Sequence, residues 1–345
     1  MEIVDAQPLW DPRPGYLNTS SYGLPPRPAF SALEVALDDW RHGRTSWEGW
    51  DESTKASRTS FATMLGVPAT DVAVASTVSG LLGPVGAALP DGARVLVPDI
   101  EFTSNVFPWA VHADRGVEVV AVSPDKLAGA IDERTTLVAF SAVQSSTGEV
   151  AAYDEIVAAA RAVGAMVVVD ATQAIGWLHR DWAAADVVVV GAYKWLMAPR
   201  GVAYAYLSPA VRDGFRPLQA GWYAGDDPHT SYYGLPLRLA EDARRFDVSP
   251  AWFCFVGQAP ALQILLDVGV DRVNAHNVGL ANRFRAGLGL APSDSAIVST
   301  DVADAEAKLK AAGIRAAVRG GKVRVSFHLY STTADVDSAL AALTR

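Results

Sequence analysis

Three polar side chains that could act together follow two apolar runs near the middle of the chain. Asp170 closes the run Val167–Val169, and Gln173 comes three residues later. A second run, Val187–Val190, leads into a turn that carries Lys194. Apolar β-branched runs predict buried strands, which would bring the three side chains to one end of a sheet. Such a set suits pyridoxal phosphate (PLP): the lysine forms an imine with its aldehyde, and the carboxylate pairs with the protonated pyridine nitrogen.

Each of these residues also has an ordinary structural explanation. Lys194 could extend its amine to the surface, and Asp170 could be a polar strand end. Lys194, however, lies in the sequence GAYKW, where aromatic neighbours would desolvate the amine and lower its pKa. Burying an unpaired carboxylate at Asp170 would be costly, and a pyridinium N–H would supply its partner. Gln173 lies close enough to reach the phenolate oxygen of the cofactor.

Three other strand ends supply further candidates for the cofactor site. After residues 72–75 the chain breaks into small and hydroxyl residues and opens an apolar helix. Helix starts bind phosphate through free N–H groups, so we assign Thr77 and Val78 to the cofactor phosphate. Phe102 could stack on a pyridine ring, and Gln144 could contact a ring substituent. The competing interpretations are an ordinary helix cap, a core phenylalanine and a hydrophilic loop.

A short strand near the C-terminus carries a candidate for substrate binding. In KVRVSFHLYST, residues 322–332, alternation places Arg324 and Ser326 on one face. The guanidinium could bind a substrate carboxylate with two parallel hydrogen bonds, although a surface ion pair is the alternative. His328 could be catalytic, but a packed, hydrogen-bonded histidine is the better interpretation. The other histidines show no metal-ligand spacing, so we expect no metal.

The composition is that of a globular enzyme. The chain has 345 residues, of which 50% are hydrophobic and 19% are charged. Its net charge of −9, without a cluster of basic residues, argues against binding to nucleic acid or to an anionic membrane. We recognise no signal peptide and no apolar run approaching the roughly 20 residues of a membrane helix. The single cysteine, Cys254, cannot form an internal disulfide, and we expect a cytoplasmic protein.

Strands and helices alternate along most of the chain, which predicts an α/β fold with a mostly parallel seven-stranded sheet. The candidate strands are 72–75, 94–98, 117–122, 136–143, 166–170, 186–190 and 202–207. The candidate helices are 30–42, 53–65 with Ser53 and Thr54 as caps, 153–163, 258–268 and 271–288. A loop-rich stretch, 217–254, precedes a final strand-helix-strand-helix pattern ending at Arg345. We therefore predict a large domain, 15–235, and a smaller α+β domain, 236–345, with which the arm 1–14 packs.

These motifs together resemble a known family. The order DATQ, two residues, Gly, a strand and YKW, with RVSFHLYST near the end, is similar to the class V aminotransferase family. This family includes the cysteine desulfurase-like branch of fold-type I PLP enzymes, and the resemblance spans roughly residues 15 to 340. It implies that Lys194 is the Schiff-base lysine, Asp170 the pyridine partner, Gln173 the phenolate contact, Phe102 the stacking residue, Thr77 a phosphate ligand and Arg324 the α-carboxylate ligand.

The resemblance also implies that two copies of the chain share their active sites. Residues 243–252 (ARRFDVSPAW) are similar to the segment that reaches the phosphate of the neighbouring subunit, with Ser249 as the contact. This implies a homodimer with composite active sites. Residues 16–26 (YLNTSSYGLPP) resemble the loop that closes over the substrate, with Asn18 and Gly23 nearest to it.

The sequence departs from the family pattern at three places. The phosphate-binding hydroxyl that the family has three residues before the lysine is replaced by Gly191, so other donors must compensate. No cysteine precedes Arg324, where desulfurases carry their persulfide nucleophile, and Cys254 lies elsewhere. We therefore predict that the protein is not a persulfide-forming desulfurase. The C-terminal domain is also short, so the substrate pocket of the family does not carry over directly to this chain.

The function that the resemblance implies is PLP chemistry on an amino acid or amine. Family members form an external aldimine with the substrate, after which a lysine, here Lys194, removes the α-proton. Transamination is the leading hypothesis. A β-lyase such as a C–S lyase, and an epimerase, are alternatives that share this opening step. A non-catalytic PLP-fold protein is a further alternative, which the presence of Lys194, Asp170 and Arg324 disfavours.

Overall fold

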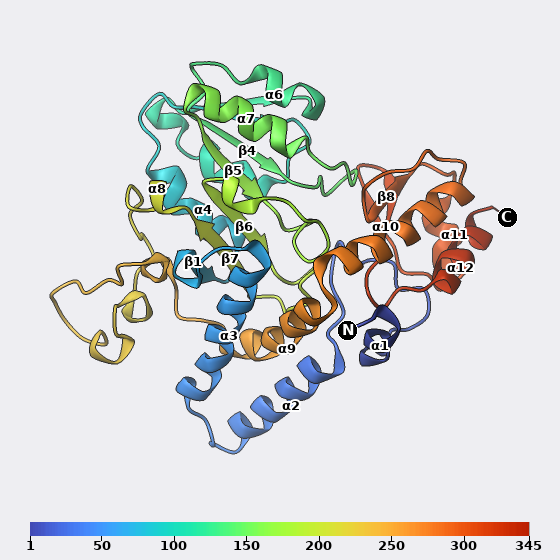
Figure 1. Cartoon of the computed structure of the whole chain (residues 1–345), viewed down its shortest axis with the longest axis horizontal. Coiled ribbons are helices and arrows are strands. Elements are labelled where there is room, and N and C mark those ends of the chain that lie inside the picture. The colour runs from blue at the N-terminus through green and yellow to red at the C-terminus, as the bar shows by residue number, and fades with distance from the viewer. Residues whose placement is uncertain (345) are drawn as a thin grey trace.

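A seven-stranded sheet lies at the centre of the larger part of the molecule (Figure 1). The computed structural model describes residues 1–344. The strands are β1 (Val72–Ala75), β2 (Arg94–Pro98), β3 (Glu118–Val122), β4 (Leu137–Ser141), β5 (Met166–Asp170), β6 (Val187–Gly191) and β7 (Ala203–Leu207). Their order is β1-β7-β6-β5-β4-β2-β3, and only β7 runs against its neighbours. The predicted mostly parallel sheet is confirmed, with each strand within two residues of its predicted ends.

The sheet is buried on both faces, which explains its continuous apolar strands. Alternate residues of β5 and β6 enter different cores, because successive side chains of a strand point to opposite faces. Val167 and Val188 belong to one core cluster, and Val168 and Val187 to the other. A parallel sheet covered on both sides favours continuous apolar runs, as Val167–Val169 of β5 and Val187–Val190 of β6 show.

Helices cover each face of the sheet. The first face is covered by α3 (Trp47–Leu65), α7 (Tyr153–Val163) and α9 (Trp252–Val268), with α2 (Arg27–Arg41) packed on α9. The second face is covered by α4 (Val78–Ala87) and the short α5 (Phe107–Ala110). The short helix α6 (Leu127–Ala130) contacts α7 and β2.

Two of the predicted helix starts are wrong. Helix α3 begins at Trp47 after Ser46, so Ser53 and Thr54 are interior residues and not caps. Helix α9 begins six residues before the predicted start at residue 258. In both cases the added turns carry large aromatic residues: Trp47 contacts Trp252, and Trp50 contacts Phe253. Packing between the two helices, which local sequence does not report, stabilises these extra turns.

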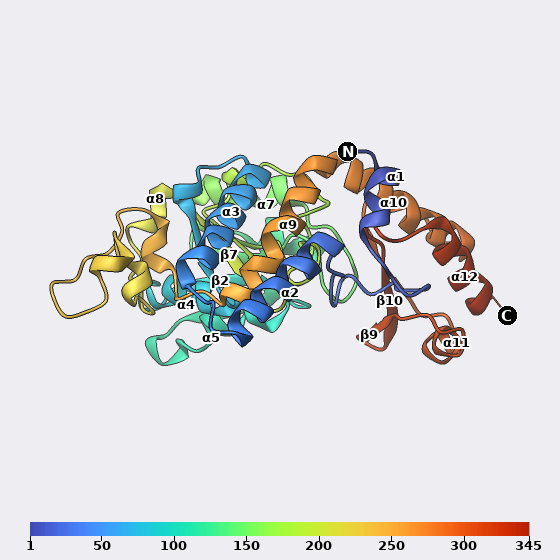
Figure 2. The same cartoon turned by 90° about the horizontal axis from the view of Figure 1, so that it is seen from below.

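A smaller α+β part follows, with an antiparallel sheet in the order β8-β10-β9 (Figure 2). Its strands are β8 (Ile297–Thr300), β9 (Ala317–Arg319) and β10 (Lys322–Ser326), and its helices are α10 (Val270–Gly287), α11 (Ala305–Ala311) and α12 (Thr333–Leu343). The predicted strand-helix-strand-helix pattern missed β9, which forms a hairpin with β10. The turn is Gly320–Gly321, both at positive φ, as a two-residue hairpin favours. The predicted end at Arg345 lies outside the described residues.

The two ends of the chain meet in this smaller part. Helix α1 (Ile3–Ala6) contacts α9 and α10, and Leu17 belongs to the core of the smaller part.

The predicted domain boundary at residue 236 stays a prediction. The packing favours a later one near Gly269, because α9 belongs to the core of the large sheet and the chain turns by 86° between α9 and α10. Among residues 1–344 no single helix could span a membrane; only α9 and α10 taken together, across this bend, reach the required length and hydropathy.

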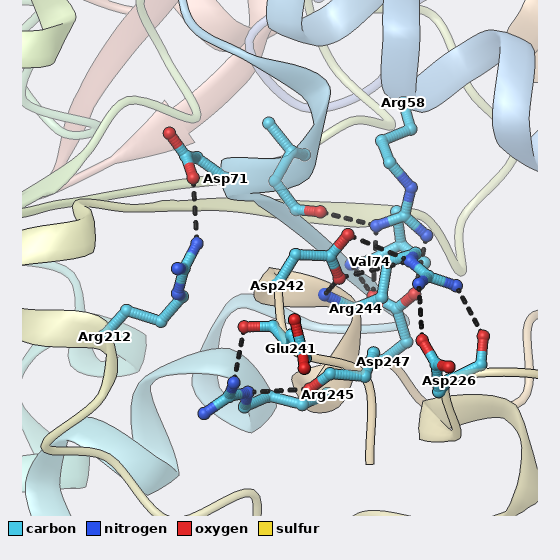
Figure 3. A network of polar contacts seen from close by, with 12 residues as sticks. Arg58, Asp71, Val74, Arg212, Asp226, Glu241, Asp242, Arg244, Arg245 and Asp247 are labelled. Carbon is cyan, nitrogen blue, oxygen red and sulfur yellow. Dashed lines mark hydrogen bonds and ion pairs between the residues drawn. The ribbon is translucent and has the colours of Figure 1, made fainter.

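A buried ion pair anchors the loop-rich stretch between β7 and α9 to the edge of the large sheet (Figure 3). The carboxylate of Asp247 accepts hydrogen bonds from Arg58 Nη2 at 2.6 Å and from the backbone N–H of Val74 at 2.7 Å. Both charged side chains are buried. Residues 243–249 are thereby held against β1, and Ser249 lies on the exposed side of that segment.

Candidate active site

A cavity of about 180 Å³ opens at the carboxyl ends of the parallel strands. Asp170 ends β5, Gly191 ends β6, and Ser141 ends β4; all three line it. Lys194 lines it from the turn after β6. Ligands in open α/β sheets bind at this edge, because the loops that follow the strands surround it. The sheet topology thus brings together side chains that lie far apart in the sequence.

Lys194 is buried at the base of the cavity, with 7% of its surface exposed. Its Nζ lies 5.7 Å from the centre of the Phe102 ring and 5.6 Å from that of Tyr193. Burial lowers the pKa of the amine to about 8, although the charge of Asp170 opposes the shift. A substantial fraction of the amine is therefore neutral near physiological pH, and the neutral amine is the nucleophilic form.

Asp170 is buried on the same side of the cavity. One carboxylate oxygen accepts a hydrogen bond from the backbone N–H of Thr172 at 2.9 Å. Burial raises the pKa of this carboxyl group, while Thr172 and the charge of Lys194 favour the ionised form. Thr172 was missed by the sequence analysis. Its hydroxyl accepts from the backbone N–H of Gly191 at 2.9 Å and so ties the end of β6 to the segment after β5.

Gln173 lines the cavity with its amide group held in one orientation. Nε2 donates to the carbonyl oxygen of Ser20 at 3.0 Å and to Ser145 Oγ at 3.3 Å. Oε1 accepts from Trp195 Nε1 at 2.8 Å. The amide therefore links the N-terminal loop, the loop after β4 and the residue next to Lys194.

The N-terminus of α4 forms the opposite wall. Thr77 is the N-cap residue, and its hydroxyl accepts from the backbone N–H of Gly80 at 3.2 Å. Val78 is the first residue of the helix, and both residues line the cavity with Ser76 and Ser79. The first N–H groups of a helix lack partners within it, so this wall can bind an anion.

Phe102 and Gln144 have different positions relative to the cavity. Phe102 lines it and is 48% exposed, which excludes a core phenylalanine. Gln144 is absent from the lining, and its Nε2 donates to Glu101 Oε2 at 2.9 Å. Glu101 was missed by the sequence analysis: it is a buried carboxylate that also accepts from the backbone N–H of Ser141 at 2.8 Å. Burial raises its pKa, against the hydrogen bonds of Ser141 and Gln144.

Arg324 is buried between two loops, with 1% of its surface exposed. Its guanidinium donates to Ser145 Oγ at 3.1 Å and to Ser21 Oγ at 3.0 Å. It has no acidic partner within residues 1–344, so the surface ion pair considered above is wrong. Nε is buried without a hydrogen-bond partner in that range. Burial lowers the pKa of Arg324 to about 10, and the group is a cation held next to the cavity by Ser145.

The N-terminal loop packs on the turn that carries Lys194. The backbone N–H of Gly23 donates to the carbonyl oxygen of Tyr193 at 2.9 Å. A Cβ at Gly23 would lie 1.9 Å from the carbonyl oxygen of Lys194, so this close approach requires glycine. Asn18 is buried beside Ser326, and its Oδ1 has no partner within residues 1–344. Neither Asn18 nor Gly23 lines the cavity.

Three other residues lie outside the cavity. Ser249 is exposed on the segment that follows Asp247. His328 is buried, with Nε2 3.0 Å from the carbonyl oxygen of Trp195. Its burial and this contact confirm the interpretation as a packed, hydrogen-bonded histidine, and burial lowers its pKa to about 3. Cys254 lies on α9 and donates to the carbonyl oxygen of Arg200. Within residues 1–344 no group of three or more potential metal ligands lies together.

The fold and this set of side chains define a fold-type I PLP enzyme. The chain belongs to the class V aminotransferase family: the sequence model described as "Aminotransferase class-V" matches residues 54–315. Members of this family use PLP. The donor set fits that cofactor, since the cavity offers an amine, a carboxylate, an amide and the start of a helix.

Relatives with curated names divide among several reactions. The chain is 25% identical to "Uncharacterized aminotransferase YcbU" of Bacillus subtilis, over 91% of this chain and 89% of the relative. It is 29% identical to a "Probable cysteine desulfurase" of Methanothermobacter thermautotrophicus, over 56% and 50%. It is 30% identical to an "Isopenicillin N epimerase" of Streptomyces clavuligerus, over 62% and 58%.

Solved structures share the fold over nearly the whole chain. A cystine C–S lyase, C-DES, in complex with its reaction product cysteine persulfide superposes with a TM-score of 0.85 at 21% identity, covering 96% of this chain and 97% of that chain. The cysteine desulfurase CsdA of Escherichia coli gives a TM-score of 0.84 at 17% identity, covering 100% and 98%. At these identities the likeness establishes the architecture.

Proposed function

We propose that this protein binds PLP in the cavity described above and transfers the amino group of an amino acid or amine. The observation that carries the proposal is the buried amine of Lys194, with a pKa lowered to about 8, in one cavity with Asp170 and the start of α4. Bound PLP supplies an electron sink for the bonds of the substrate's α-carbon. The side chains and backbone of the protein must hold the cofactor, bind the substrate and move the proton.

Each residue of the site has a definite task in this proposal. Lys194 would attach the cofactor and, as a neutral amine, would take the proton from the α-carbon of the substrate and deliver it to the cofactor carbon. Asp170 would pair with the pyridine nitrogen and keep it protonated, since a buried carboxylate favours a cationic partner. Gln173 would offer an N–H of its amide to the phenolate oxygen in place of the 3.3 Å hydrogen bond to Ser145 Oγ, and Phe102 would cover the ring. The backbone N–H groups of Thr77 and Val78 would hold the phosphate.

Substrate binding falls to Arg324 and the N-terminal loop. A buried guanidinium without an acidic partner favours a carboxylate ligand, because that ligand restores charge balance. Oδ1 of Asn18 is buried, has no partner within residues 1–344 and lies outside the cavity, so it would reach a donor on the substrate or the cofactor only if the N-terminal loop moves. Gly23 holds this loop against the turn of Lys194. Gln144 would act on the site through Glu101, because its Nε2 donates to that carboxylate and Gln144 does not line the cavity.

Transamination is the preferred reaction. YcbU of Bacillus subtilis, which matches this chain over 89% of its own length, is named an aminotransferase. Persulfide formation is disfavoured because the single cysteine, Cys254, is outside the cavity. Burial also raises the pKa of its thiol, which makes it a poorer nucleophile. The C–S lyase and the epimerase among the similar proteins support the alternatives.

A homodimer is the second part of the proposal. Helix α2 exposes Phe30, Val35 and Trp40, and the stretch before α9 exposes Tyr233 and Leu235. Apolar surface of this extent favours burial against a protein partner. The segment held by Asp247 would then present Ser249 to the phosphate of the other subunit. Sedimentation velocity should give a dimer mass, and a monomer at micromolar concentration would contradict this part.

The absorbance spectrum tests the cofactor, and product analysis tests the reaction. Protein loaded with PLP and desalted should show a visible band that Lys194→Ala lacks or shifts. If no band appears at any PLP loading, the protein is not a PLP enzyme. Full activity of Lys194→Ala would refute the proposed role of the lysine. Transamination requires an added 2-oxo acid. Pyruvate released without one would indicate β-elimination, and inversion at the α-carbon alone would indicate an epimerase.

A further inference from the structure

Arg200 is a cation that lines the cavity, and no carboxylate among residues 1–344 neutralises it. Two aromatic residues hold its guanidinium instead. Nη1 donates to the hydroxyl of Tyr22 at 3.1 Å, and Cζ lies 4.9 Å from the centre of the Tyr193 ring. A cation held in place by neutral groups remains available to an anion.

The strand register places Arg200 beside the start of α4. Strands β1 and β7 are antiparallel, with Ala75 opposite Ala203. The residues that follow Ala75 therefore lie next to those that precede Ala203. Ser76–Ser79 and Arg200 accordingly line the same cavity. A guanidinium and the free N–H groups of a helix start thus converge on one side of it.

Gly191 and Tyr193 explain why a charged residue is needed at this place. Gly191 also pairs with Ala203, from the β6 side of β7. A Cβ at Gly191 would lie 3.2 Å from Cε1 of Tyr193, so the aromatic ring fills the space beside the glycine. Arg200 rests on that ring. A serine or threonine at position 191 could have donated a hydrogen bond into the cavity. In its place the chain has the Tyr193 ring, which supports the guanidinium of Arg200.

The charges across the cavity point to the ligand. Asp170 lies on β5, and β6 separates it from β7 in the sheet. The positive side of the cavity is formed by Arg200 and α4, and the negative side by Asp170. A ligand with a cationic nitrogen at one end and an anionic group at the other fits this arrangement. PLP has this charge distribution, with its phosphate as the anionic end.

We propose that Arg200, supported by Tyr193 and Tyr22, binds the cofactor phosphate and replaces a hydroxyl at position 191. This inference rests on the proposed function, because it assigns a residue to the cofactor of that site. The guanidinium can offer two parallel N–H groups to the phosphate, while α4 offers backbone N–H groups. The alternative ligand is a second acidic group of the substrate, which the experiment distinguishes.

The test compares PLP with pyridoxal, which lacks the phosphate. Both are titrated into the cofactor-free protein, and the dissociation constants are measured by absorbance and tryptophan fluorescence. Arg200→Gln should weaken PLP binding roughly ten- to hundredfold, the usual cost of a charged hydrogen bond, and leave pyridoxal binding unchanged. Arg200→Lys, which keeps the charge, should lose less. Equal weakening of both ligands, or of neither, overturns the proposal.

Two further variants separate this role from general effects of charge and folding. Arg319 also lowers the pKa of Lys194 through its charge but lies outside the cavity, so Arg319→Gln should leave the preference for PLP over pyridoxal intact. Gly191→Ser added to Arg200→Gln should recover part of the PLP affinity, since Tyr193 needs to move by only a few tenths of an ångström. No recovery would contradict the replacement of the hydroxyl.

The outcomes also separate this proposal from the proposed function. Wild-type protein that binds neither PLP nor pyridoxal refutes both. Wild-type protein that binds PLP, with an Arg200→Gln variant that binds it equally well, refutes only the role of Arg200. An Arg200→Gln variant with unchanged PLP affinity and a raised KM for a diacidic substrate assigns the residue to the substrate.

Discussion

The side-chain nitrogen of Lys194 lies 5.7 Å from the centre of the Phe102 ring, although 92 residues separate them in the sequence. The amine is buried, while almost half of the ring remains exposed. Both residues line the cavity, so the buried amine and the partly exposed ring border the same space. This relationship sets the reactivity of Lys194 and gives the first prediction.

In the cofactor-free protein, Lys194 should react with an apparent pKa of about 8. An unperturbed lysine has a pKa of about 10.4. Since burial lowers the pKa, the reactive neutral amine should predominate above about pH 8 and decline as the pH falls through that value. Acylation measured at each lysine by mass spectrometry over a pH series gives the profile. The exposed Lys322 is the internal reference, and coinciding profiles would contradict the prediction.

Arg324→Ala should raise the KM for a substrate with a carboxylate. The expected loss is about 1.5 to 3 kcal/mol of binding, or roughly ten- to hundredfold, because a charged hydrogen bond is removed. Steady-state kinetics with an amino acid and with the corresponding amine without its carboxylate provide the measurement. The amine should show little change. A retained PLP spectrum would show that the buried substitution has not disrupted the site, and an unchanged KM for the amino acid would exclude this role.

Gly23→Ala should destabilise the protein by about 1 to 3 kcal/mol, the usual cost of overpacking. The added Cβ would lie 1.9 Å from the carbonyl oxygen of Lys194, so the N-terminal loop must move away from the active-site turn. Denaturant unfolding measures the loss, and PLP affinity should fall with it. Gly221→Ala is the matched control, because its Cβ would meet no atom within 4 Å. Equal stability of the two variants would show that the loop accommodates the methyl group.

Asp247→Ala should lower the free energy of unfolding by about 3 to 5 kcal/mol, since it leaves the buried charge of Arg58 without its partner. The exposed pair Arg283–Asp337 has a similar geometry, with contacts of 2.8 and 2.9 Å. Asp337→Ala is therefore the control and should change stability little, because water screens exposed ion pairs. Urea unfolding of both variants provides the comparison. A small loss for Asp247→Ala would show that the loop-rich stretch is not held by this ion pair.

Much of the large sheet could be predicted because its signals are local. Continuous valine-rich runs of four or five residues between helical segments indicate strands buried on both faces, and every predicted strand forms. Helix starts were less predictable. The first turns of α3 and α9 are stabilised by each other, through pairs such as Trp47 and Trp252, and 205 residues separate these two in the sequence. The strand β9 was not predicted, because it is only three residues long and its one local signal is the Gly320–Gly321 turn that follows it.

The sequence by itself determined the class of chemistry. The residue types at Asp170, Gln173 and Lys194, and their places after two strands, follow from local pattern alone. Only the tertiary structure decided what the other polar groups contact. Gln144 turns to the buried Glu101, and Arg324 lies between Ser145 and Ser21, because loops from distant parts of the chain meet there. Periodicity reports which face of an element is buried, but a hydrogen-bond partner depends on how the elements pack.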